Sequence, residues 1–541
     1  MRKSISYCTL LLLGCVLVPL CAAQEHDHGA MSGQLGTVTF PTSCTPSVQK
    51  HFESAVAMLH SFWYEESEKN FAEVTAADPS CAIAYWGIAM SLYHPLWYPP
   101  DAAALKKGSE ALTKAKSIGA KTARERDFIA ALDKFYSDTD KLDHKTRAAA
   151  YESAMEQVAA RYPDDREATI FYALALLATA SPADKTYSHQ KKAGAMLEKI
   201  FAEQPNHPGV AHYIIHSYDY PPLAERALPA ARAYAKIAPA APHALHMPSH
   251  IFTRVGAWQE SIQSNLASER AAKEYGERTH MKGAWAQQLH AMDYLEYAYL
   301  QTGQDSEAKD VLDECRAMQV TEFGSDLTAG YAAAAIPARY TLELHRWSEA
   351  AALDPASVPS PVSKAIIYHA KATGAARSGD LAAARQAIGN LDELYGTLKA
   401  KDDYWAGQIE IQRREAAAWL MQAQGKQDEA VAMMRSAAEL EDATEKHPVT
   451  PGAVLPAHEQ LGDLLLDLKR PADALAQFEM TLQVAPNRFN GLYGAAKAAE
   501  LSGDAKKAGL YYAQLIKVSA EDSPRPELAT ARSYLKNMAE K

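Results

Sequence analysis

The chain has 541 residues, 22% of them charged, and a formal net charge of -11. This length exceeds what one hydrophobic core ordinarily fills, so we expect an extended array of units or several domains. The acidic balance argues against nucleic acid or an anionic membrane surface as a partner. Ala, Leu, Glu and Lys are frequent while Gly and Pro stand mostly at joints, which favours an all-α fold.

Residues 1–23 have the layout of a cleaved secretory signal peptide. Arg2 and Lys3 precede an apolar run and small residues that end at Ala23, a pattern unlike that of a membrane span. Cleavage there leaves 53 basic against 66 acidic residues, a net charge of -13. The alternative is a lipoprotein signal ending at Cys15, although the apolar run before it is very short. We expect an exported protein, periplasmic or secreted, with no transmembrane segment in the mature chain.

Residues 24–45 are small, polar and rich in Gly without periodicity, so we expect a flexible tail. After cleavage, His26 is the third residue of the mature chain. An amino terminus, two amide nitrogens and this imidazole can surround Cu(II) or Ni(II) in a square plane, which those ions prefer. The alternative is a disordered tail with incidental histidines, and cyclisation of Gln24 would destroy the metal site.

A 34-residue period runs through most of the remaining chain. Small residues recur where the two helices of a pair touch, aromatic residues fill the gap to the next pair, and Pro begins the following connection. The residues that show this pattern are Ala55, Phe71 and Pro79 in the first unit and Ala474, Phe478, Pro486, Ala508 and Tyr512 near the C-terminus. The period predicts a series of paired helices.

This pattern resembles the tetratricopeptide repeat. The segments SFWYEESEKNFAEVTAADPSCAIAYWGIAMSLYHPLW and HALHMPSHIF closely resemble a group of exported bacterial tetratricopeptide proteins. The resemblance covers most of residues 46–520 and is weak from about 100 to 200. It implies an all-α superhelix (an α-solenoid) whose concave groove holds a peptide, a protein or a small molecule. It says little about activity, because the repeat is a scaffold that serves many partners.

We expect the superhelix to have two halves. The N-terminal repeats are predicted over residues 46–353 and the C-terminal repeats over 364–541, joined by the Pro- and Ser-rich stretch 354–363. The helix pairs predicted in the middle of the chain span 166–200, 208–238, 242–272, 287–318 and 363–396. The stretch 445–460 contains three Pro and one Gly, and it is either an ordinary connection or a lid folded over the groove.

Three cysteines stay in the mature chain. In an oxidising exported compartment we expect one disulfide. Cys44 and Cys81 are the natural pair, because each stands just before a helix and these two helices are parallel neighbours in the repeat. Cys315 is then expected as a buried apolar residue.

Eight of the 19 histidines lie between His207 and His290. Positions 2, 5 and 9 of the first repeat helix resemble the set that faces the groove in tetratricopeptide proteins. In three successive repeats these positions hold Gly209, His212 and His216, then His243, His246 and His250, then His290, Asp293 and Tyr297. Spacings of three and four residues place each set on one helical face. Asp219 extends this stripe by one turn beyond His216.

The sequence therefore predicts a transition-metal site for Zn, Cu or Fe, because imidazole nitrogen and carboxylate oxygen are common ligands of these ions. The predicted ligands are His212, His216, His246, His250 and Asp293, the last as a ligand or as the acceptor that orients an imidazole. The residues predicted to line the groove around them are His243, His290, Asp219 and Tyr297. One ion or two side by side would fit this set.

Two alternatives without metal stay open. In one, the imidazoles line a polar groove that recognises a peptide or a small acid, and the protein is a non-enzymatic interaction scaffold. In the other, they pack against aromatic residues in an interior sealed by the other half of the superhelix. The sequence has no phosphate-binding Gly-rich loop, no HExxH motif and no nucleophile elbow, so it does not choose between an enzyme and an interaction module.

Overall fold

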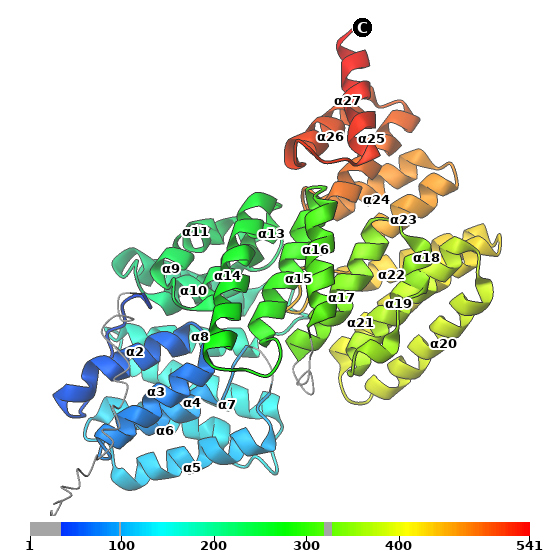
Figure 1. The fold of residues 1–541 in the computed structure, drawn as a ribbon. Helices are drawn as coiled ribbons and strands as arrows, with labels where there is room; N and C mark the ends of the chain where they lie inside the picture. The colour runs from blue at the N-terminus through cyan, green and yellow to red at the C-terminus, as the bar shows by residue number, and fades with distance from the viewer. Residues whose placement is uncertain (1–33, 97–98, 319–326, 541) are drawn as a thin grey trace, which may run out of the picture.

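The computed structural model describes residues 34–96, 99–318 and 327–540, which form helices, turns and loops and no strand. The expected signal peptide, Cys15 and the expected metal site at His26 lie outside the described residues. Among the described helices, none has the length and apolar character that a bilayer span requires. Figure 1 shows the helices following one another along a curved path from the N-terminal to the C-terminal part of the chain.

The helices before residue 320 are η1 (Pro46–Val48), α2 (Gln49–His60), α3 (Tyr64–Ala77), α4 (Ala82–Ser91), α5 (Ala102–Ile118), α6 (Ala123–Tyr136), α7 (His144–Arg161), α8 (Arg166–Thr179), α9 (Ser188–Glu203), α10 (Pro208–Tyr218), η2 (Ala224–Ala227), α11 (Leu228–Ile237), α12 (Pro242–His246), α13 (Pro248–Arg254), α14 (Trp258–Arg278), α15 (Ala286–Gln301) and α16 (Asp305–Ala317). Those that follow are α17 (Leu327–Glu343), α18 (Trp347–Ala351), η3 (Pro355–Ser357), α19 (Pro361–Ser378), α20 (Leu381–Leu398), α21 (Asp403–Ala423), α22 (Gln427–Asp442), α23 (Ala457–Asp467), α24 (Pro471–Val484), α25 (Phe489–Ser502), α26 (Ala505–Val518) and α27 (Pro526–Ala539).

Helices that are neighbours in sequence pack as pairs, as the repeat predicts. The expected pairs are present as α8 with α9, α10 with α11, α12 and α13 with α14, α15 with α16, and α19 with α20. Small and aromatic residues alternate at the contacts: a Cβ on Gly87 would lie 2.5 Å from the ring of Phe71, and one on Gly462 would lie 2.7 Å from that of Phe478. The prediction of an all-α, tetratricopeptide-like superhelix is confirmed.

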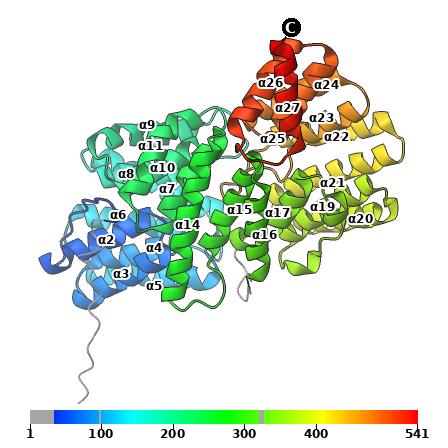
Figure 2. The same cartoon turned by 45° about the horizontal axis from the view of Figure 1, so that its top comes forward.

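The C-terminal helices fold back onto the middle of the chain, where α25 contacts α15 (Figure 2). Trp258 Nε1 donates to the carbonyl oxygen of Asn487 at 2.8 Å, and Ser523 Oγ donates to that of Gly303 at 2.8 Å. These contacts join residues more than 200 positions apart. The turns that follow α13 and α15 are therefore covered by segments that come much later in the sequence.

Residues 34–45 are packed against the helical array, so the predicted flexible tail is wrong for this part of it. Gln34 and Thr37 form backbone hydrogen bonds with Ala240 and Asn206, and Phe40 lies against α2. Leu35, Val38 and Phe40 are buried, and the Phe40 ring centroid lies 5.2 Å from that of Phe52. Removing three apolar side chains from water offsets the entropy lost when the segment is ordered. The Gly-rich composition did not predict this packing, because only these few apolar side chains are buried in the segment.

Apolar packing continues across the predicted joint at 354–363. One buried cluster contains Tyr331 and Leu342 before this segment and Val362 and Ile366 after it. The core is therefore not divided at this segment, and a boundary between two halves stays a prediction from the sequence.

Cys44 and Cys81 form a disulfide, with their Cα atoms 4.8 Å apart, and Cys315 is a buried free thiol. The bond closes a loop between residues 37 positions apart.

We expect the double variant Cys44→Ala, Cys81→Ala to lose about 4 kcal/mol in the free energy of unfolding of the N-terminal helices, because the unfolded chain regains loop entropy. Urea titration followed by tryptophan fluorescence measures this loss. The double variant unfolding at the same urea concentration as Cys315→Ala would contradict the expectation.

Candidate metal centre

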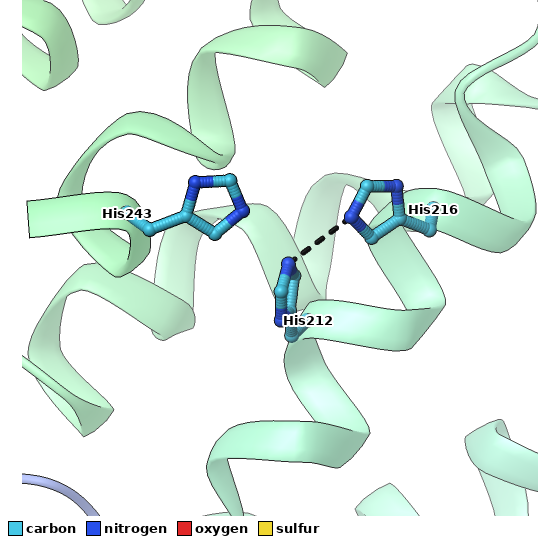
Figure 3. A group of neighbouring side chains, drawn as sticks. All are labelled: His212, His216 and His243. Atoms are coloured by element: carbon cyan, nitrogen blue, oxygen red, sulfur yellow. Dashed lines mark hydrogen bonds between the residues drawn. The ribbon is translucent and has the colours of Figure 1, made fainter. Parts of the chain in front are cut away.

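Six histidines from three segments of the superhelix meet at one place on its concave side. They form two groups of three, and within each group one ring nitrogen per residue lies within 4.8 Å of the others. The first group is His212, His216 and His243, and the second is His246, His250 and His290. All six are buried, with 0–9% of each residue exposed. Figure 3 shows the imidazoles of the first group directed toward a common centre.

The local sequence explains why these rings converge. His212 and His216 are four residues apart on α10, and His246 and His250 have the same spacing across α12 and α13, so each pair shares one helical face. Pro248 at the start of α13 has no N–H, so the helical hydrogen bond to the carbonyl oxygen of Ala244 is missing and α12 is separated from α13.

A close approach of α10 to α2 supports the first group. A Cβ on Gly209 would lie 2.5 Å from Nδ1 of His60, so a larger residue at this position would push the two helices apart. The close contact brings His212 Nδ1 to 2.7 Å from the carbonyl oxygen of His60. The glycine at groove position 2 therefore has a packing role.

Hydrogen bonds fix the proton positions in the second group. Asn265 Nδ2 donates to the carbonyl oxygen of Ser261 at 2.8 Å, so Asn265 Oδ1 is an acceptor, and it lies 2.7 Å from His246 Nδ1. His250 Nδ1 donates to Asp219 Oδ2 at 3.0 Å. In the neutral form both rings therefore carry their proton on Nδ1 and have a lone pair on Nε2. These two Nε2 atoms are 3.0 Å apart.

Two lone pairs that face each other at this distance repel, and the contact becomes favourable when a proton or a metal ion lies between them. The first group has a related arrangement. The carbonyl of His60 accepts only, so His212 also carries its proton on Nδ1, and its Nε2 lies 3.1 Å from Nε2 of His216. His243 Nδ1 lies 3.3 Å from Oε1 of Gln287.

Burial disfavours a proton as the bridging cation. Desolvation lowers the pKa of all six imidazoles, that of His212 to about 3, and the neighbouring histidines lower most of these pKa values further. The hydrogen bond to Asp219 partly offsets this for His250. The rings are therefore neutral at neutral pH, which is the form that binds a metal ion.

Asp219 is the carboxylate that holds the second group in place. Besides His250, it accepts from Arg254 Nε at 2.8 Å through Oδ1 and from Lys446 Nζ at 2.9 Å through Oδ2. Burial by itself would raise the pKa of Asp219, but Lys446, Arg254 and His250 outweigh it and hold this pKa well below its usual value. A charged carboxylate behind a metal-binding imidazole fixes the orientation of the ring and strengthens its donor nitrogen.

Asp293 does not belong to either group of three, and its role as a ligand stays a prediction from the sequence. Its Oδ1 accepts from Arg339 Nη1 at 2.7 Å, and burial raises its pKa in spite of this partner. Counted around α15 from His290, Asp293 is turned by about 60° in one direction and Tyr294 by about 40° in the other. That difference places the Asp293 carboxylate beside Arg339 of α17 instead of the imidazoles.

Tyr297 is also displaced from its predicted place around the histidines. Its hydroxyl accepts from Arg488 Nη1 at 2.8 Å. Tyr294, which the repeat register did not single out, takes that place: its ring centroid lies 4.8 Å from those of both His246 and His250. The helical spacing of four from His290 was the signal that could have identified it.

The loop between α22 and α23, residues 443–456, lies across the groove and is called the covering loop below. Lys446 reaches Asp219, and the carbonyl oxygen of Thr450 accepts from the Tyr294 hydroxyl at 2.8 Å. The neighbouring Glu445 accepts from the Tyr187 hydroxyl at 2.7 Å. Of the two interpretations of this stretch, the contacts favour a segment that covers the histidines.

A third cluster, His60, Glu167 and His207, was not recognised in the sequence as a unit. Val210 N–H donates to Nδ1 of His207, whose Nε2 then donates to Glu167 Oε1 at 2.8 Å. His60 Nε2 lies 3.0 Å from Glu167 Oε2. Both rings contact the Glu167 carboxylate through Nε2, so the cluster forms a hydrogen-bonded link between α2, α8 and the start of α10. His207 begins the histidine-rich stretch, but no pattern in the sequence linked it to His60 or Glu167.

No protein-family model matches the sequence, and no curated protein matches it. Among solved structures, human IFIT1 in its dimer with m7Gppp-AAAA is 13% identical with a TM-score of 0.38, over 81% of this chain and 90% of that one. Yeast Tom70 is 11% identical with a TM-score of 0.32, over 90% and 96%. The Cut9–Hcn1 hetero-tetramer is 11% identical with a TM-score of 0.32, over 91% and 90%. We draw no functional conclusion from likenesses this distant.

Proposed function

We propose that the protein is a metalloprotein that holds two transition-metal ions side by side, one in each group of three histidines. The observation that carries this proposal is the contact between Nε2 of His246 and Nε2 of His250 at 3.0 Å, where hydrogen bonds to Asn265 and Asp219 leave a lone pair on both atoms. A metal ion bound by both nitrogens removes their repulsion.

The donor atoms narrow the choice of ion. Each group offers three neutral imidazoles, which suit Zn, Cu and Fe and do not suit Mg or Ca. Three protein ligands leave a further coordination position for water or for a substrate. A bound ion of this kind would make its water more acidic or, if it were copper or iron, would supply chemistry with oxygen. Three imidazole donors suit both hydrolysis and reactions with oxygen, so they do not determine the reaction.

Export of the protein is also proposed. The disulfide between Cys44 and Cys81 supports it, because such bonds persist in oxidising compartments and are rare in the cytosol. In the periplasm or outside the cell, the buried histidines would take their ions from the surrounding medium.

A second candidate function is a non-enzymatic scaffold that binds a partner in the concave groove without metal. A cavity of about 340 Å³ lined by aromatic and acidic side chains in the C-terminal part supports it. In that case the six histidines are a buried polar layer of the superhelix. Metal content separates this candidate from the metalloprotein.

We expect the mature protein, purified without a histidine tag, to hold about two transition-metal ions per chain after incubation with Zn(II), Cu(II) or Fe(II) and gel filtration. Removing the ions with a chelator should lower the melting temperature, because the ions bind only the folded groups. Elemental analysis and calorimetry measure both effects. Fewer than about one ion per five chains after aerobic and anaerobic loading would overturn the proposal.

A further inference from the structure

The cavity of about 340 Å³ lies between α17, α19, α21, α22 and the covering loop. The covering loop separates it from the histidines, since Lys446 and Thr450 line the cavity and also contact Asp219 and Tyr294. The cavity is therefore a second site, on the other side of the covering loop from the six histidines. Its volume suits a small organic molecule.

The acidic side of the cavity has two carboxyl groups, Glu415 and Glu441, that pair with no lysine or arginine among the described residues. Glu415 is 2% exposed, and its Oε1 has no hydrogen-bond partner among the residues that the structure describes. Its Oε2 lies 3.0 Å from His369 Nε2. Glu441 accepts from the N–H of Ala457 at 3.0 Å, and burial together with Glu415 raises the pKa of Glu441 to about 8.

The basic residues that line the cavity are already engaged. Lys185 pairs with Glu445 at 2.8 Å, and Arg254 and Lys446 pair with Asp219. Within the described ranges, no lysine or arginine forms an ion pair with Glu415 or with Glu441, although the other ion pairs of this region are made. A buried carboxylate without a cation is costly, and a bound cation would remove that cost.

The other side of the cavity is apolar and aromatic. Tyr331 and Trp405 are buried with ring centroids 6.1 Å apart, and Trp405 and Glu415 line the cavity from the same helix, α21. Ile366, Ile409 and Leu455 complete the wall. Aromatic faces attract cations and also accept apolar groups.

We propose that this cavity binds a small organic ammonium ion, with its charged nitrogen at Glu415, beside Glu441, and its apolar body against Ile366 and Ile409. An ammonium group supplies donors to the oxygen of Glu415 that has none and compensates the charge of that carboxylate, and it would favour the ionised form of the neighbouring Glu441. A metal ion is a poorer fit, because these residues do not form one of the tight ligand clusters found among the described residues.

The test is titration calorimetry on the chelator-treated full chain with phenethylammonium chloride, which has a primary ammonium group on an apolar body. We expect saturable binding that 2-phenylethanol, its neutral analogue, does not reproduce. Glu415→Gln should weaken binding about tenfold or more, because the amide keeps the shape and loses the charge. The matched control is Glu410→Gln on the same helix, whose carboxylate pairs with Arg413 and Arg414 away from the cavity.

Three results would overturn the proposal: equal binding of the alcohol, unchanged binding by Glu415→Gln, or displacement of the amine by millimolar calcium chloride. A melting curve of Glu415→Gln shows whether that variant is folded. His246→Ala should bind the amine as tightly as the unaltered protein does, because this site does not depend on the metal centre. Failure of the metal proposal would thus leave this result unchanged.

Discussion

The His246→Ala variant is expected to hold about one transition-metal ion per chain where the unaltered protein holds about two. His246 is fully buried and supplies one of three nitrogens of the second group, so its loss should empty that group. The first group has its own three rings and its own support from His60, and should keep its ion. His212→Ala should give the converse result.

Elemental analysis after loading measures the ion count, and His458→Ala is the control. His458 is buried in the C-terminal part, where its Nδ1 contacts Gln477, and it should not affect the count. Melting temperatures with and without metal separate binding from packing. Adding metal should raise the melting temperature of His246→Ala by less than it raises that of the unaltered protein. This difference does not depend on how much stability the substitution removes from the metal-free protein. A full rise with two bound ions would contradict the assignment of His246 as a ligand.

Asp219→Asn is expected to weaken metal binding at the second group by about 10- to 100-fold. The amide cannot provide the charge that now holds the Nδ1 proton of His250, and it leaves Arg254 and Lys446 buried beside a neutral group. We expect an accompanying loss of about 3 to 5 kcal/mol in unfolding free energy, as when one partner of a buried ion pair is removed. Competition with a chromophoric chelator measures the affinity.

Asp293→Asn is the matched control, with the same chemical change at another buried aspartate. Because Asp293 pairs with Arg339, which also contacts Glu296, this variant should lose stability and keep both metal affinities. The opposite result is a fall in metal affinity for Asp293→Asn and none for Asp219→Asn. It would show that Asp293 acts at the metal, as the repeat register predicted, and that the hydrogen bond from His250 to Asp219 does not affect metal binding.

The repeat and the histidine positions could be predicted because they depend on local regularities. A 34-residue period and spacings of three and four residues determine which side chains share a helical face, whatever surrounds the helix. His212, His216, His246 and His250 follow from these rules, and His243 and His290 were placed beside them. The helix pairs from 166 to 396 follow in the same way.

The grouping of the six rings required the tertiary structure. On α15, the side chains of His290 and Asp293 point in directions that differ by about 60° around the helix axis. Counting positions in the repeat does not determine which of two directions this close together faces the other histidines. The sequence could not distinguish Asp219 from Asp293. Asp219 directly follows the groove-facing helix α10 and Asp293 stands on α15, and only the tertiary structure determines which of them meets His250. The burial of Phe40 could not be predicted either, because it depends on tertiary contacts such as the one with Phe52.

Contacts between distant parts of the chain were beyond the sequence altogether. Lys446 meets Asp219 across 227 positions, and Asn487 meets Trp258 across 229. Such contacts depend on the summed rotation of many stacked helices, where small errors at each step accumulate. The sequence by itself thus determined an all-α repeat with histidines on one concave face. The three-dimensional path of the superhelix decided that these histidines form two buried groups of three, which carboxylate orients them, and what covers them.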